Sequence, residues 1–490
     1  MTPSLSNSTK VLVDVTRDVA NQNLIFHAHF PPCGAWTMHL PVWRPGRYEL
    51  GNFAQYLMSV EGVNAHGERI LLRKSDLHAW HVPASVQEVA WVFHADILNA
   101  GSTCVESELL YVNPVNCMMF DPMREHLGYS ISLSDLTLAP DAPEGWALAT
   151  ALPWTIVQGH PVLEARDVQH VMDSPWIASP RLWHDVYREQ GIDFHVWIHD
   201  TLPQDPNQFV ADHVAFTRSQ IAAFGSFPAS EYHFLYLFPD SEVRHGVEHE
   251  DSTVIALGPA SRVKSAEGYL EILGIASHEL YHAWNVKRIR PSEWMPYNFT
   301  GPSPSQLGYI AEGVTTYMGD LFLFEAGIVD LKGWCTLMKG LLERHVNNPG
   351  RLNMSVAASS YDTWLDGYKP GVPGRKGSIY VEGAVLAFLC DVRIMSCTEG
   401  RHSLSTAMKL LWERFGQPRH GITAADYWQT LEEVAGESLE DLRTSYAEGT
   451  DDSWEALVEG MRTQGLALSQ TRDTQGRIHI VLEPLTTYPA

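Results

Sequence analysis

Two histidines and a glutamate lie close together in residues 277–285, and their spacing suits metal chemistry. His278 and His282 are four residues apart, and Glu279 directly follows the first. On a helix, positions i and i+4 lie on one face, so both imidazoles can reach the same ion. Glu279 projects beside them, where it could handle a water that the metal activates. This HExxH spacing indicates a zinc-dependent hydrolytic site.

The alternative is two surface histidines on a helix beside a solvated glutamate, and 23 histidines make a chance match easier. The residues around the motif are apolar, which argues against that alternative: Ile272, Leu273, Ile275, Ala276, Leu280 and Trp284. A buried helix must provide partners for its polar groups, and a metal ion would do so.

A catalytic zinc needs a third protein ligand and one open position. Glu312 lies in an otherwise apolar stretch, where a carboxylate without a partner is costly. We therefore expect one Zn²⁺ per chain, bound by His278, His282 and Glu312. Asn285 and Asp320 lie at helical spacing from these ligands and could orient them, but each fits an ordinary polar surface residue equally well.

Two further residues fit the handling of a peptide. Glu248 precedes a strand-like run and could bind a free ammonium group, while Tyr380 lies where a helix opens and could donate a hydrogen bond to an oxyanion. Composition alone distinguishes neither from the other glutamates and tyrosines. A cluster of cations, Lys287, Arg288 and Arg290, fits the last turn of a helix better than a substrate-carboxylate site.

The elements that would position these residues follow from periodicity. Residues 1–170 show short apolar stretches punctuated by Pro and Gly, which predicts a β-sandwich. Strands are predicted at 194–198, 232–237 and 253–257, and a final β-hairpin within 466–490. Helices are predicted at 207–224, 271–290, 305–326, 330–346, 378–397, 403–415, 423–434, 438–448 and 453–462. The predicted fold class is a multidomain α+β protein.

Composition limits the possible partners. The 490 residues imply two to four domains, and the net charge of −24 argues against nucleic acid and anionic membranes. No apolar run is long enough to span a bilayer, and residues 1–22 lack a signal-peptide pattern, so we expect a cytoplasmic protein. Its six cysteines lack CxxC pairs and are expected to be free thiols.

Residues 278–291 closely resemble the active-site helix of the M61 glycyl aminopeptidase family, a gluzincin family related to thermolysin and aminopeptidase N. Residues 311–317 resemble its third-ligand helix, and residues 246–249 resemble its substrate-amine motif. Residues 380–383 resemble its YxKG motif, and residues 41–48 resemble its PxWxPGxY segment. These matches occur in the family's order.

The resemblance implies a fold and a set of roles. It implies an N-terminal β-sandwich at 1–170, a thermolysin-like catalytic domain at 171–400 and a helical domain at 401–465. It assigns Gly246 and Glu248 to the substrate amine and Tyr380 to the oxyanion. The implied substrates are peptides with a free N-terminal Gly or Ala.

The chain departs from the family's pattern in three places. The separation of His282 and Glu312 is longer than in thermolysin, so residues 291–304 must loop out between two helices. Glu382 stands where the YxKG motif has lysine, which reverses the local charge. Residues 466–490 are too few for the PDZ domain that family members often carry.

Two other functions remain open from the sequence. An endopeptidase could use the same zinc site without needing a free N-terminus. A non-catalytic binding protein could retain the fold, although an intact Glu279 argues against it. The sequence leaves the oligomeric state undetermined.

Overall fold

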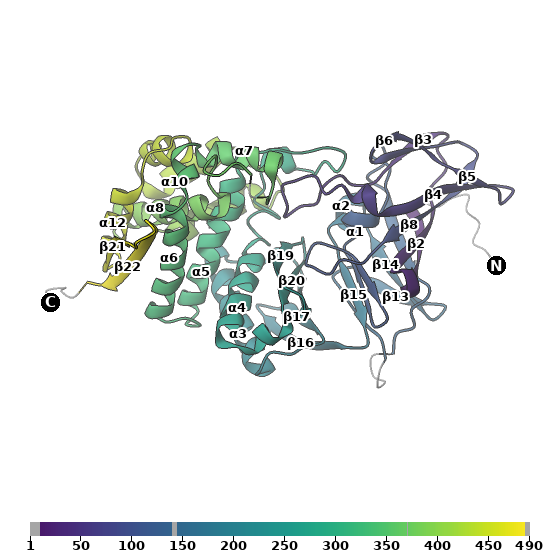
Figure 1. Ribbon diagram of the computed structural model, residues 1–490, viewed down its shortest axis with the longest axis horizontal. Coiled ribbons are helices and arrows are strands. Elements are labelled where there is room, and N and C mark those ends of the chain that lie inside the picture. The colour runs from purple at the N-terminus through teal and green to yellow at the C-terminus, as the bar shows by residue number, and fades with distance from the viewer. Residues whose placement is uncertain (1–9, 140–144, 370, 486–490) are drawn as a thin grey trace. The chain divides into compact units, whose positions relative to one another are not determined.

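The computed structural model describes residues 10–139, 145–369 and 371–485 (Figure 1). The chain forms two compact units, each built from separate stretches of sequence. The first comprises Met1–Pro206, Ala229–Ile272 and Pro296–Pro302, and the second comprises Asn207–Pro228, Leu273–Met295 and Ser303–Ala490.

The first unit contains several β-sheets. Its largest sheet has eight strands in the order β13-β14-β11-β1-β2-β8-β4-β5. In chain order these are β1 (Lys10–Asp18), β2 (Asn23–His29), β4 (Leu57–Asn64), β5 (Arg69–Leu71), β8 (Val86–His94), β11 (Gly128–Leu133), β13 (Trp154–Val157) and β14 (His160–Ala165). Alternate residues are buried, as the period of a strand with one covered face requires. Phe26 and Trp91 stack across β2 and β8 with ring centroids 4.9 Å apart.

Two smaller sheets complete this β-rich region. One contains β3 (Trp36–His39), β6 (Arg73–Asp76) and β7 (Ala79–Val82). The other contains β9 (Cys104–Glu106), β10 (Leu109–Val112), β12 (Ala147–Thr150) and β15 (Trp176–Ser179). The short helices α1 (Pro114–Cys117) and α2 (Val168–Met172) lie between these strands in sequence.

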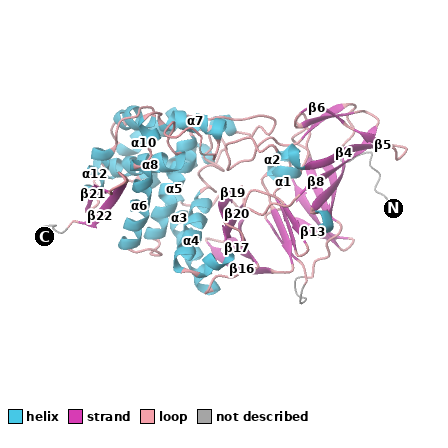
Figure 2. Ribbon diagram, in the orientation of Figure 1, coloured by secondary structure: helices cyan, strands magenta, loops and turns pink. Residues whose placement is uncertain are grey.

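A mixed five-stranded sheet follows in the order β16-β17-β18-β20-β19. Its strands are β16 (Leu182–Glu189), β17 (Ile192–His199), β18 (Glu231–Leu237), β19 (Val243–Glu248) and β20 (Ser252–Gly258), drawn in magenta in Figure 2. The three central strands are parallel, and β19 pairs antiparallel with β20 at one edge. This edge strand carries Gly246 and Glu248.

The second unit is mainly helical. Helix α4 (Ala266–Tyr281) begins in the first unit and enters the second at Leu273. The other long helices are α3 (Pro206–Phe224), α5 (Thr315–Glu325), α6 (Leu331–Val346), α7 (Val356–Asp366), α8 (Ile379–Cys397), α9 (Leu404–Leu411), α10 (Ala424–Ala435) and α12 (Trp454–Thr463). Shorter helical turns include the π-helical turn η6 (Tyr309–Val314), η8 (Trp412–Gly416), α11 (Glu440–Leu442) and η9 (Arg443–Ala447). The chain continues into the hairpin of β21 (Leu466–Arg472) and β22 (Ile478–Pro484). The predicted α+β class, with a β-rich region, a mixed sheet and then helices, is confirmed.

Two helix predictions around the motif were wrong in detail. The helix predicted at 271–290 ends at Tyr281, because the following segment bends to satisfy tertiary contacts instead. The Trp284 indole N–H donates to Ser226 O at 3.0 Å, and the Arg290 side chain donates to the main-chain oxygens of Val286 and Lys287. Lys287, Arg288 and Arg290, which were predicted to lie in the last turn of a helix, are instead buried in this bend.

The helix predicted at 305–326 begins later, with η6, and continues as α5. The sequence reading did not identify α7, β16 or β19. The predicted hairpin forms, although residues 486–490 of the predicted 466–490 segment lie outside the described residues. The domain boundaries at 170, 400 and 465 stay predictions.

The six cysteines agree with the expectation of free thiols. All six cysteines are free, and Cys104, Cys117 and Cys390 are buried. Within the described ranges, every helix is too short or too polar to cross a bilayer.

Candidate metal centre

Helix α4 carries His278 and Glu279 in its last turn. Ser277, which is fully buried, fixes this turn. The Ser277 hydroxyl donates to Gly319 O on α5 at 2.7 Å and accepts from Gln220 Nε2 on α3 at 3.0 Å. Three helices are thus joined by hydrogen bonds one residue before the first metal-ligand candidate. The Glu279 side chain is buried as well, with 5% of the residue exposed.

His282 lies just past the last helical residue, and its ring is oriented by the main chain. Its Nδ1–H donates to Asn285 O at 2.6 Å. Because a neutral imidazole carries one proton, this bond leaves the lone pair on Nε2. That Nε2 lies 3.0 Å from Nε2 of His278. Two imidazole nitrogens therefore face each other in a position to bind one ion.

Glu312 completes the group from the π-helical turn η6. Its Oε2 lies 3.4 Å from His282 Nε2 and 3.6 Å from His278 Nε2, and only 2% of the residue is exposed. Ligands about 2.0–2.2 Å from a tetrahedral zinc are about 3.4 Å from one another. The three donor atoms have this separation, so they fit a zinc ion.

The charge on Glu312 agrees with this arrangement. Burial alone would raise its pKa, but the charges of the two histidines and their hydrogen bonds hold it well below the usual range. An ionised carboxylate facing two imidazole nitrogens is the donor set that zinc prefers. A π-helical turn often marks a functional site, because the extra residue reorients side chains locally.

Asn285 joins the segment that carries His282 to the one that carries Glu312. Its main-chain oxygen orients His282, while its side-chain Nδ2 donates to Ile310 O at 2.9 Å and to Thr315 Oγ1 at 3.0 Å. The predicted contact with a ligand is therefore made by the main chain. Thr315, which the sequence reading missed, follows Glu312 by three residues and also lies within reach of His282 Nδ1, at 3.5 Å.

Asp320 is half-buried on α5, eight residues after Glu312. Its predicted role as the partner of a ligand stays a prediction. Gly319, directly before it, lies against His278: a Cβ there would lie 3.0 Å from the His278 Cα. A side chain at position 319 would therefore push α4 and α5 apart at the candidate ligand.

Tyr380 stands in the first turn of α8. Ser378 caps this helix by accepting from Val381 N, and the Tyr380 hydroxyl lies 3.2 Å from the hydroxyl of Tyr368. Tyr368 lies between the motifs, so no pattern in the sequence pointed to it. Each of the two hydroxyls can donate to the other or to a third acceptor.

Glu248 and Gly246 belong to the first unit, whereas the other predicted site residues belong to the second. Glu248 is buried at the end of β19, with 4% of the residue exposed. Gly46 lies against it with φ +77°, and a Cβ at this glycine would collide with the Glu248 carboxylate. Only glycine allows the 41–48 segment to pass so close to that carboxylate.

His245 holds the same segment to β19. Arg44 Nη2 lies 3.0 Å from His245 Nε2, and both residues are largely buried. Burial and the charges of Arg44 and Arg47 hold the pKa of His245 well below its usual range. A neutral His245 can accept the Arg44 N–H, and this bond fixes the segment that lies against Glu248.

Solved structures show which class of protein has this fold. An aminopeptidase N family protein from Idiomarina loihiensis is similar with a TM-score of 0.87 and 22% identity, covering 94% of this chain and 79% of that one. An M1 zinc metallopeptidase from Deinococcus radiodurans is similar with a TM-score of 0.54 and 12% identity, covering 92% of this chain and 97% of that one. A variant of that enzyme bound to the peptide Tyr-Ser-Ala has a TM-score of 0.53 and 13% identity, covering 90% and 94%. The fold is that of M1-like zinc metallopeptidases.

Family models identify the chain more closely. Residues 10–180 match the peptidase M61 N-terminal domain, and residues 271–386 match the M61 glycyl aminopeptidase model. The chain belongs to the M61 glycyl aminopeptidase family and is a zinc metallopeptidase. A search of curated protein sequences finds no significant match.

Proposed function

We propose that this metallopeptidase removes a small N-terminal residue, glycine or alanine, from peptides, using one zinc ion held by His278, His282 and Glu312. The observation that carries this proposal is the convergence of three buried or half-buried donor atoms 3.0–3.6 Å apart. When bound there, zinc would polarise the scissile carbonyl and lower the pKa of a water.

Two further side chains carry out proton transfer and stabilise the oxyanion. Glu279 takes a proton from the attacking water and passes it to the leaving amine. The Tyr380 hydroxyl donates a hydrogen bond to the carbonyl oxygen as negative charge develops on it. Both roles rest on family membership and on the positions of these residues in α4 and α8.

Glu248 binds the N-terminus of the substrate and so determines which peptide bond is cleaved. Its carboxylate pairs with the α-ammonium group, so that cleavage falls after the first residue. The close passage of Gly46 restricts the space around this carboxylate, which supports a preference for a small first side chain. The substrate is therefore a peptide with a free N-terminus.

The test compares an Ala- or Gly-initiated peptide with its N-acetylated form, using zinc-loaded protein. Cleavage of the free peptide alone supports the aminopeptidase, while equal cleavage of both refutes it in favour of an endopeptidase. Glu248→Gln should abolish the preference for the free peptide, because the amide cannot pair with the ammonium. Glu242→Gln, at an exposed glutamate just before β19, is the matched control and should change nothing.

A further inference from the structure

Glu382 lies two residues after Tyr380 in the first turn of α8. The sequence alone does not explain why a carboxylate stands at this position, where the YxKG motif has lysine. Residues two apart on a helix point to nearly opposite sides, so Glu382 faces away from the tyrosine. Only 8% of Glu382 is exposed. A carboxylate removed from water in this way must find partners inside the protein.

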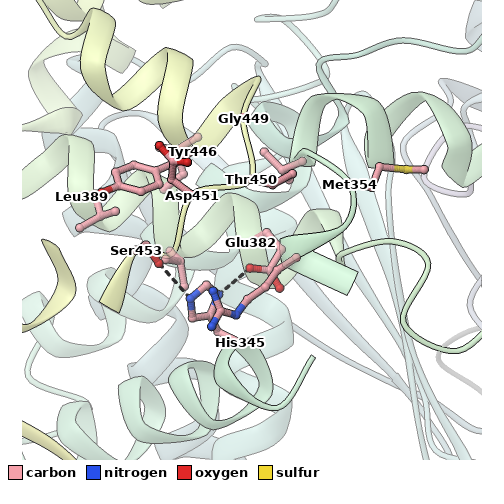
Figure 3. A pocket seen from close by; sticks show the side chains of 13 residues that line it. His345, Met354, Glu382, Leu389, Tyr446, Gly449, Thr450, Asp451 and Ser453 are labelled. Atoms are coloured by element: carbon pink, nitrogen blue, oxygen red, sulfur yellow. Dashed lines mark hydrogen bonds and ion pairs between the residues drawn. The ribbon is translucent and has the colours of Figure 1, made fainter. Parts of the chain in front are cut away.

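His345 and Ser453 provide those partners (Figure 3). His345 Nδ1, on α6, lies 2.5 Å from Glu382 Oε2, and its Nε2 lies 3.0 Å from the hydroxyl of Ser453. Because an ionised carboxylate only accepts, Nδ1–H donates to Glu382, and in the neutral ring Nε2 accepts from the Ser453 hydroxyl. Ser453 directly precedes α12, so this Glu382–His345–Ser453 relay connects α8, α6 and α12.

The relay resembles the order of groups in a serine-hydrolase triad, but its surroundings leave no room for a substrate. The adjoining cavity has a volume of only about 30 Å³. Glu382 Oε1 and Arg351 Nε border it and have no hydrogen-bond partner among the described residues. A cavity of this size holds about one or two waters, which can satisfy both atoms. The relay is therefore a structural connection.

An adjacent face of the same helical turn, about 100° around the helix from Glu382, lies against the segment that carries Glu312. A Cβ at Gly383 would lie 2.8 Å from the Gly313 Cα and 2.6 Å from Tyr309 O, so the two backbones touch. Gly313 directly follows Glu312. The first turn of α8 is thus held by the relay on one face and by η6 on an adjacent face.

We infer that Glu382 is a positioning residue: through its bonds to His345 and Ser453 it keeps the first turn of α8 in contact with η6. This contact in turn places the Tyr380 hydroxyl relative to the metal ligands. This inference rests on the proposed role of Tyr380. It also explains the acidic residue at this position: the protein matches Glu382 with a buried histidine and a serine, so the turn is held without the lysine of the YxKG motif.

The test compares Glu382→Ala with Glu382→Gln, assayed on the free Ala- or Gly-initiated peptide. The alanine variant loses the relay, and misplacement of a reacting group by a fraction of an ångström lowers kcat on the order of tenfold. Glutamine still accepts the His345 N–H, so it should restore kcat. KM and the zinc content should remain those of the unchanged protein in both variants. Glu433→Ala removes an exposed carboxylate of the Arg414 ion pair and should leave kcat unchanged.

A Tyr380→Phe background separates positioning from general stability. If Glu382 acts through the tyrosine hydroxyl, Glu382→Ala causes no further loss once that hydroxyl is absent. An additive loss, or an unchanged kcat in Glu382→Ala, would overturn the inference while leaving the proposed function intact. Full activity of Tyr380→Phe would overturn the proposed role of the tyrosine, and this inference with it. Should Glu382→Ala fold poorly, Ser453→Ala removes only the far hydroxyl and should show a smaller loss in kcat of the same kind.

Discussion

Replacing Gly313 with alanine tests the close contact between η6 and α8. A Cβ at Gly313 would lie 2.8 Å from Ala384 N and nearer still to the Gly383 backbone, whereas ordinary contacts begin at 3.4 Å. The closest backbone atom, the Gly383 Cα, sets the shift that is needed, so the two backbones must part by about 1 Å, and neither can yield as a flexible side chain would. Overpacking of this kind costs about 1–3 kcal/mol of the free energy of unfolding.

The same displacement should also reach the metal centre, because Glu312 directly precedes Gly313. An error of 1 Å in a catalytic geometry costs about 100-fold, so a displacement of this size should lower kcat/KM on the order of 100-fold. Gly340→Ala is the matched control: Gly340 lies in α6, and its Cβ would meet nothing within 4 Å. Alanine there should stabilise the protein by about 0.5–1 kcal/mol.

The assay measures the Tm, the zinc dissociation constant by chelator competition, and kcat/KM for both variants. Opposite shifts in Tm, with weaker zinc binding only in Gly313→Ala, agree with the reasoning. A Gly313→Ala variant as stable and active as Gly340→Ala would refute the close contact.

Three further outcomes are expected. Glu279→Gln should abolish turnover while zinc content by elemental analysis stays unchanged, because an amide cannot take the proton; retained turnover would remove Glu279 as the base. Asn285→Ala should weaken zinc binding about 10–100-fold in chelator competition, since it loses the side-chain bonds to Ile310 and Thr315; an unchanged affinity would mean that the main-chain bond to His282 suffices. His213 is buried with its pKa lowered to about 4, so the unfolded chain binds more protons below pH 6.5 and stability falls as the pH drops toward 4. Between pH 7 and pH 5, denaturant titrations should show that the free energy of unfolding falls by about 2 kcal/mol less in His213→Gln than in the unchanged protein. Equal decreases in the two proteins would contradict burial as the cause of the lowered pKa.

The sequence was most informative where chemistry and periodicity coincide. The spacing of His278 and His282, together with an acidic residue in an apolar stretch at Glu312, predicted three donors that the structure brings together. Long amphipathic or apolar segments, such as α3, α6 and α8, were predicted nearly at their observed bounds. Such patterns report local structure directly, because burial of one face requires them.

Tertiary contacts determine what the sequence could not show. Helical periodicity continues past Tyr281, yet the helix ends there and Trp284 bonds instead to Ser226, 58 residues earlier, while Arg290 bonds back to the bend itself. The partners of Glu382 are 37 residues before it and 71 after it, so no local sequence pattern predicts its contacts with His345 and Ser453. Gly46 and Gly313 matter through backbone contacts that composition does not encode.

The interleaving of the two units affects how the chain can fold during synthesis. The first unit is complete only when Pro296–Pro302 has been made, after the last of its strands, β20 (Ser252–Gly258). Until then Trp43 and Phe120 lack the rings of Tyr297 and Phe299 that pack on them, and Trp43 lacks Asn298 O. A nascent chain that stalls before residue 296 therefore exposes aromatic surface, which favours chaperone binding or aggregation. The N-terminal β region is thus not a module that can be cut out or grafted at a single point in the sequence.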